Sequence, residues 1–144
     1  MFVFKLKGYT KKFAFYFCSC YNMGMIRAIR GAICAENIEN SILSRTKELL
    51  RELFCVNEIG IENVLAITFT CTKDLDAVYP AVAARSMGLV NASLMCTAEM
   101  DVKDAMQGLV RVQVLAETNT AQSDIKHIYL GKAKALRPDI TKEV

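Results

Sequence analysis

The segment Leu109–Ala116 reads LVRVQVLA and alternates valines with polar or larger side chains. Successive side chains of a β-strand point to opposite faces of the sheet. The valines therefore share one face, whereas Arg111 and Gln113 share the other. Any fold for this chain must contain a sheet with one face packed on a core and a second face that accepts charge.

Further segments predict the strands that accompany this one. Val64–Thr70 is rich in β-branched residues, which is typical of a buried strand. Met25–Ile33 is expected to form a strand that ends at Gly31. Ser93–Cys96 is expected to be a short strand, and His127–Leu130 with Ala133–Leu136 is expected to give one or two last strands.

Two helices are expected between the strands. Asn37 or Asn40 can cap a helix that runs to about Asn57, because apolar positions recur there with helical period opposite a charged face. Pro80 fits the first position of a second helix, and Gly88 fits the residue just past its end.

These elements predict one mixed α/β (α+β) domain over residues 25–144, with about five strands and two main helices. Two helices cannot cover both faces of such a sheet. The uncovered face must contact something else, and a second copy of the chain is the simplest partner. We therefore expect an oligomer.

The first 24 residues differ from the rest, with several lysines and a short aromatic run over Phe13–Phe17. A signal peptide needs a longer apolar stretch and a small-residue cleavage site, and this run is too short to span a bilayer. We interpret residues 1–24 as a disordered extension or the product of an upstream start, with Met25 or Met23 as the working start.

Composition argues against several classes of function. A net charge of +3 over 144 residues is too small to indicate nucleic-acid binding, although it suits a small polyanionic ligand. Six cysteines occur without a C-x-x-C pair, and His127 is the only histidine, so a zinc site is poorly supported. Reduced cysteines in a cytoplasmic protein, with no metal and no membrane span, are the expected state.

Several polar residues stand where chemistry is possible. Arg30 has the strand parity of Ile26 and Ala32, which indicates the apolar side of its strand. The other candidates are Arg85 in the last turn of the second helix, Glu99 just after a strand, Arg111, and Tyr129 on a late strand. Each has a structural alternative: a surface salt bridge, a loop carboxylate, a helix terminus or a core tyrosine.

No nucleophile motif, dinucleotide-binding loop or phosphate-binding loop occurs in the sequence. Arginines with a carboxylate, a tyrosine and a thiol would bind a carboxylate-rich ligand and act on it electrostatically.

Five stretches together resemble the monofunctional bacterial chorismate mutases of the trimeric α/β class, in the same order and spacing. They are Arg27–Ala32, Asp74–Ala81, Cys96–Val102, Leu109–Val112, and His127–Leu130 followed by Leu136–Asp139. The resemblance covers residues 25–139. It implies a homotrimer with a barrel-like core, active sites between neighbouring subunits, and conversion of chorismate to prephenate without a cofactor.

By this resemblance, nine residues match active-site positions of the family. Arg111, Glu99 and Arg30 would be catalytic, and the substrate would also contact Tyr79, Ala81, Arg85, Cys96, Tyr129 and Leu136. The sequence also departs from the family pattern. Tyr79 replaces the usual phenylalanine, Val82 stands where lysine is frequent, and the segment between Arg85 and Cys96 is one residue shorter and lacks a tryptophan.

Two alternatives remain open at this point. A trimeric deaminase of reactive imines shares a similar α/β trimer with a carboxylate-binding arginine, and Glu99 could activate water there. A non-catalytic trimer that binds a metabolite for regulation is the other. The run Cys96–Val102 with Leu136–Asp139 matches the mutase better.

Overall fold

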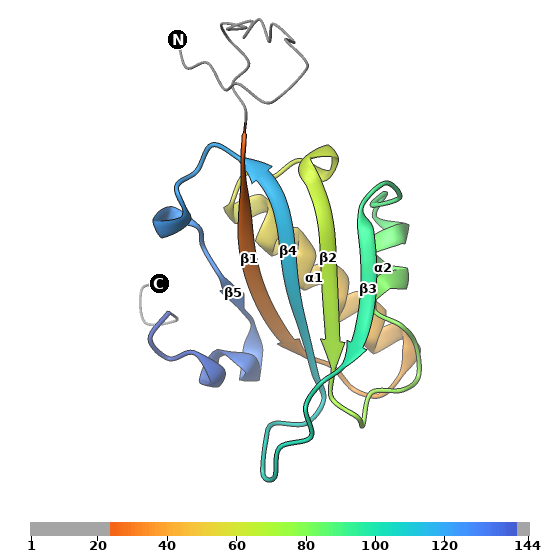
Figure 1. Cartoon of the computed structure of the whole chain (residues 1–144). Coiled ribbons are helices and arrows are strands. Elements are labelled where there is room, and N and C mark those ends of the chain that lie inside the picture. Colours follow the sequence, from red (N-terminus) through yellow and green to blue (C-terminus); the bar gives the residue numbers. More distant parts are fainter. Residues whose placement is uncertain (1–23, 141–144) are drawn as a thin grey trace, which may run out of the picture.

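A computed structural model describes residues 24–140, and Figure 1 shows its elements in order. The strands are β1 (Met25–Cys34), β2 (Val64–Cys71), β3 (Ser93–Ala98), β4 (Leu109–Thr118) and β5 (Ile128–Tyr129). The helices are α1 (Glu39–Val56) and α2 (Ala81–Ser86), with 3-10 turns at Ile61–Asn63, Gln122–Asp124 and Gly131–Leu136.

The five strands form one mixed sheet in the order β3-β2-β4-β1-β5. β4 lies at its centre and pairs antiparallel with β1 and β2, whereas β2 pairs parallel with β3 and β1 with β5. In this register Arg111 is opposite Ala32 on one side and Thr70 on the other. The expected fold class, with about five strands and two main helices, is confirmed.

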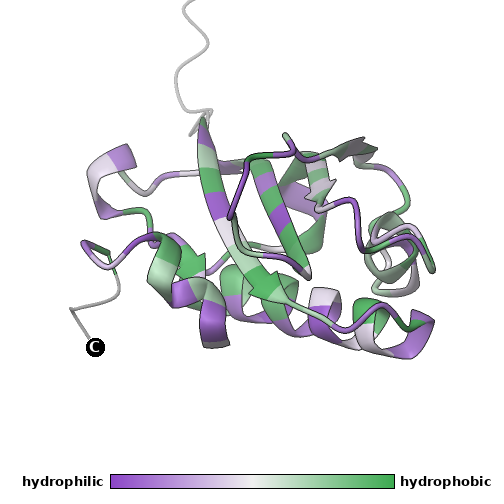
Figure 2. Cartoon of the chain, turned by 90° about the horizontal axis from the view of Figure 1, so that it is seen from below, coloured by the Kyte–Doolittle hydropathy of each residue, from purple (hydrophilic) through white to green (hydrophobic). Residues whose placement is uncertain are grey.

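The core lies between one face of the sheet and the helices. Side chains of α1 such as Leu49 and Leu53 are fully buried against Ile29, Phe69 and Val114 of the sheet. Within residues 24–140 neither α-helix covers the opposite face, which is open in Figure 2. The alternation read from the sequence of β4 is confirmed, because its valines are buried while Arg111 and Gln113 are exposed.

Arg30 lies on this open face, so its assignment to the apolar side of β1 is wrong. The core-facing residues of β1 are Ile29 and Ile33, both fully buried, and they have the opposite parity. The misleading signal was Ala32, which is apolar and fully buried because it belongs to a second small cluster on the open face, together with Leu109 and Ala133. The strand also continues past Gly31 to Cys34.

The predicted asparagine cap of the first helix is wrong as well. α1 begins after Ile38, and no side chain caps it. Asn37 instead accepts hydrogen bonds from the backbone N–H groups of Asp76 and Ala77, each at 3.0 Å, and donates to the Asp76 carboxylate at 2.7 Å. Its amide therefore ties the start of α1 to the loop that leads into α2.

The segment Ala133–Leu136 is not a strand. Gly131 adopts φ +54, a left-handed conformation that glycine tolerates, and a 3-10 turn follows. In that turn Ala133 and Leu136, three residues apart, both pack on the small cluster of the open face. The second helix begins one residue later than predicted, with Pro80 as its N-cap, and Gly88 follows its end at φ +96.

Residues 1–23 and 141–144 lie outside the described residues, as does the interpretation of residues 1–24 as an extension, apart from Gly24. The four described cysteines, at positions 34, 55, 71 and 96, are free thiols. In the part of the chain that the structure describes, no helix combines the length and the apolar character needed to cross a membrane.

Candidate active site

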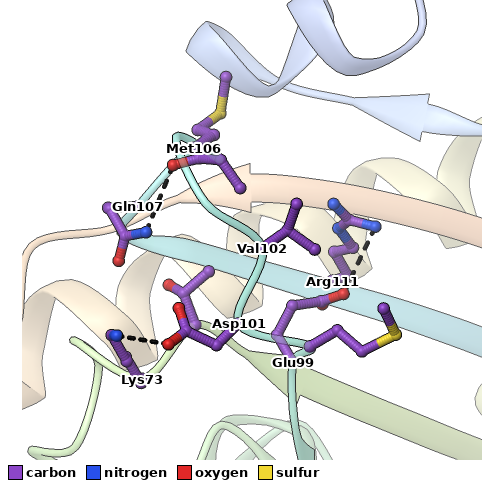
Figure 3. A pocket seen from close by; sticks show the side chains of 10 residues that line it. Lys73, Glu99, Asp101, Val102, Met106, Gln107 and Arg111 are labelled. Carbon is purple, nitrogen blue, oxygen red and sulfur yellow. Dashed lines mark hydrogen bonds and ion pairs between the residues drawn. The ribbon is translucent and has the colours of Figure 1, made fainter.

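Glu99 and Arg111 face each other on the open side of the sheet (Figure 3). Arg111 projects from the middle of the sheet on β4, and Glu99 is the first residue after β3. Glu99 Oε1 lies 3.6 Å from Arg111 Nη1. The Glu99 side chain is only 19% exposed, whereas that of Arg111 is 46% exposed and reaches solvent.

The backbone fixes the place of Glu99. Its N–H donates to the Cys71 carbonyl at 2.8 Å, which extends the β2–β3 ladder by one residue. Thr70 Oγ1 donates to Glu99 Oε2 at 2.5 Å. Both ends of Glu99 are therefore held by the last residues of β2.

Glu99 and Arg111 line a cavity of about 250 Å³ beneath the connection from β3 to β4. The remaining lining residues come from segments 72–73, 100–102 and 105–107. Lys73 and Asp101 form an ion pair of 2.6 Å at the cavity, away from Arg111 (Figure 3). A guanidinium and a carboxylate at the same cavity suit a ligand that carries negative charge and a hydroxyl.

Three further predicted residues lie on the same face as Arg111. Arg30 is opposite Gln113 of β4, so it lies diagonally across from Arg111. Tyr129 is the register partner of Ala32, and Tyr129 and Leu136 both pack on the small cluster beside β4. The sheet thus collects Arg30, Glu99, Arg111, Tyr129 and Leu136 on its open side.

The other four predicted residues lie elsewhere in the chain. Cys96 is the register partner of the buried Phe69 and packs against the main core, on the face opposite Arg111. Ala81 is buried at the start of α2, Arg85 is exposed in its last turn, and Tyr79 is 73% exposed just before it. A single chain therefore does not bring the nine predicted residues together.

Burial and nearby charge shift the pKa values of two groups near these residues. The pKa of Cys71 is raised to about 11, mainly by burial and also by Cys96, Glu99 and Asp74, so the thiol stays neutral. The pKa of His127 is lowered by burial and then by the Arg30 and Arg137 guanidinium groups. His127 Nδ1 accepts the backbone N–H of Arg30 at 3.2 Å, which requires that nitrogen to be unprotonated.

Arg137 and Asp139 form a two-pronged ion pair close to Tyr129. Arg137 Nε donates to Asp139 Oδ1 at 2.9 Å, and Nη2 donates to Oδ2 at 2.7 Å. These bonds lower the pKa of Asp139 to about 2. The pKa of Arg137 is raised in turn, first by its hydrogen bond to Asp139 and to a smaller extent by Tyr129.

Sequence reasoning missed Thr70, Lys73 and Asp101. A signal was available, since Lys73 and Asp101 each follow a strand and the ends of parallel strands meet at one edge of a sheet. Thr70 shares the strand parity of the polar face, which the β-branched composition of β2 concealed. Among the described residues no group of three or more His, Cys, Asp or Glu side chains is placed to hold a metal ion.

Comparisons with known proteins agree with this fold. A family model described as chorismate mutase type I matches residues 26–140. The chain is 39% identical over 119 residues to the chorismate mutase AroH of Bacillus subtilis, which covers 81% of this chain and 94% of that protein. It is 38% identical over 118 residues to the chorismate mutase AroH of Thermus thermophilus, covering 81% of this chain and 97% of that protein.

A solved structure of a chorismate mutase from Clostridium thermocellum matches with a TM-score of 0.74 at 41% identity. The match covers 75% of this chain and 97% of that one. These matches do not favour the imine deaminase or the binding protein. The chain therefore belongs to the type I chorismate mutase family.

Proposed function

We propose that this chain converts chorismate to prephenate in the cytoplasm, without a cofactor, by orienting the substrate and stabilising charge. Chorismate carries two carboxylates, an ether bridge and a ring hydroxyl. In the rearrangement a C–O bond of the ether breaks as a C–C bond forms within the same molecule. Because no proton transfer or covalent intermediate is needed, a site without a nucleophile is sufficient.

The pairing of Glu99 with Arg111 at the cavity supports this proposal most strongly. Negative charge develops on the ether oxygen as its bond to the ring breaks. We assign Arg111 to this oxygen and to the side-chain carboxylate, because a partly exposed guanidinium has donors free to make charge-assisted bonds. Arg30 and Tyr129 would hold the same carboxylate from the neighbouring strands.

Glu99 would act on the other half of the substrate. Its carboxylate would accept a hydrogen bond from the ring hydroxyl, helped by Cys96, and would favour the positive character of the ring as the ether bond breaks. Arg85 would hold the ring carboxylate near the mouth of the site. Tyr79, Ala81 and Leu136 would supply apolar walls.

The two groups of predicted residues argue for a site shared between chains. Arg30, Glu99, Arg111, Tyr129 and Leu136 would come from one subunit, and Tyr79, Ala81, Arg85 and Cys96 from its neighbour in a homotrimer. The open face supports this assembly, because Ile26 is 57% exposed and Met95 is 55% exposed on it. Contact between copies would remove these apolar side chains from water.

Loss of chorismate absorbance tests the proposal, with purified protein in a buffer that contains a metal chelator. Prephenate is verified by acid conversion to phenylpyruvate. Removal of one donor to developing negative charge costs roughly 10²- to 10³-fold in rate, so Arg111→Ala should lose at least that much kcat. Arg51→Ala, which removes an exposed arginine of α1, is the matched control and should keep normal turnover. Near-normal turnover by Arg111→Ala would refute the assignment.

A further inference from the structure

Thr70 is the last residue of β2 whose side chain lies on the open face, and it lies beside Glu99 and Arg111, which are predicted to be catalytic. It is the register partner of Arg111 on β4 and of Thr97 on β3. Its side chain is partly buried, and its hydroxyl donates to Glu99 Oε2 at 2.5 Å. The same carboxylate presents its other oxygen, Oε1, to Arg111.

This arrangement divides the Glu99 carboxylate between two partners. The Oε1 to Arg111 Nη1 distance of 3.6 Å is longer than a charge-assisted hydrogen bond, which measures about 2.7–2.9 Å. Carboxylate and guanidinium groups prefer a bidentate pairing when nothing restrains them. Such a pairing would occupy the Arg111 N–H donors. The Thr70 hydroxyl is a neutral donor, and its bond to Glu99 Oε2 holds that oxygen away from the Arg111 guanidinium.

We propose that Thr70 is a positioning residue for the mutase reaction, whose hydroxyl holds one oxygen of Glu99 so that the carboxylate does not close onto Arg111. The Arg111 donors then remain available to the substrate. Glu99 Oε1 stays directed at the cavity, where the ring hydroxyl would lie. The inference rests on the roles proposed above for Glu99 and Arg111.

The test compares three variants of the full chain by steady-state kinetics. Thr70→Val removes the hydroxyl at nearly constant volume, and a hydrogen bond to a charged group corresponds to roughly a 10- to 100-fold change in kcat. KM should change much less, because Arg30 and Arg85 still hold the substrate carboxylates. Thr70→Ser keeps the hydroxyl and should retain most of kcat. Thr68→Val, on the same strand and face but without a bond to Glu99, is the matched control and should be unaffected.

A double-variant cycle separates this inference from the site assignment. If Thr70 acts through Glu99, Thr70→Val should cost little further activity in a Glu99→Gln background. An equal loss in both backgrounds would overturn the inference, as would a loss by Thr70→Ser as large as that of Thr70→Val. If Glu99→Gln alone is nearly as active as wild type, the proposed site fails instead. If Thr70→Val does not fold, the serine variant still decides, because its hydroxyl must sustain kcat.

Discussion

Asn57 links the end of α1 to the strand that carries Tyr129, and its replacement should destabilise the protein substantially. The side chain is 6% exposed. Its Nδ2 group donates to the Leu53 and Lys126 carbonyls, each at 2.9 Å, and its Oδ1 accepts the Lys126 N–H at 2.8 Å. Asn57→Ala removes all three bonds, so the Lys126 N–H and carbonyl lose this partner, whereas the Leu53 carbonyl still accepts the backbone N–H of residue 57 at 3.4 Å.

The magnitude follows from these bonds. At about 1 kcal/mol net for each hydrogen bond, the loss should reach about 3 kcal/mol in the free energy of unfolding. Urea unfolding at a fixed protein concentration measures it, since the stability of an oligomer depends on concentration. Asn91→Ala, in an exposed loop, is the matched control and should cost less than about 0.5 kcal/mol.

The same variant should loosen β5. Lys126 precedes β5 by two residues, so the backbone amides of Ile128 and Tyr129 should exchange hydrogen faster in Asn57→Ala. A loss of stability below about 1 kcal/mol, with unchanged exchange at these amides, would refute the reasoning.

Two further predictions concern pH and backbone strain. Because burial and the Arg30 and Arg137 charges lower the pKa of His127 from its ordinary value of 6.5, the unfolded chain binds this proton more readily than the folded chain. Its contribution to stability is therefore complete above pH 6.5 and is lost as the pH falls below that value. His127→Gln should flatten the fall in urea midpoint between about pH 7 and pH 5.5, and an unchanged slope would contradict this origin. Gly108→Ala should destabilise more than Gly88→Ala. Both glycines have positive φ, +66 and +96, but only at Gly108 would a Cβ meet a backbone atom, the Ala35 carbonyl oxygen at 2.8 Å. The backbone strain common to both is about 1–2 kcal/mol, and equal unfolding free energies would argue against the clash.

The sheet could be predicted from the sequence because its strands have clear patterns. β4 alternates valines with Arg111 and Gln113, and β2 is a run of β-branched residues. The period of α1 and the glycine after α2 located both helices to within a few residues. Arg111 was placed on the polar face, and Glu99 just past a strand, from spacing alone.

The corrections arise where distant contacts override local preference. Asn37 has the chemistry of a helix cap, but the backbone of Asp76 and Ala77 uses its amide instead. Ala133–Leu136 has apolar composition like a strand, yet Gly131 turns the chain and a 3-10 turn buries the same side chains. Neither contact leaves a signal in the neighbouring sequence.

The residues of the candidate site stay a prediction, and their arrangement could not be foreseen from the sequence. The resemblance named nine positions, and nothing in the spacing placed Cys96 on the opposite face from Arg111. That separation follows from strand parity combined with the β2–β3 register, since Cys96 pairs with Phe69 and Arg111 with Thr70. It leads to the proposal of a shared site.

Complementation between two inactive variants tests the shared site most directly. Arg111→Ala removes a residue of the first group, and Arg85→Glu places a repelling charge in the second, where the exposed helix end tolerates it. Each variant alone should lose most chorismate mutase activity. When the two are co-expressed and assemble at random, about a quarter of the sites should receive both intact groups and recover turnover. A mixture no more active than its separate components, or near-normal activity of Arg85→Glu alone, would contradict a site built from two subunits.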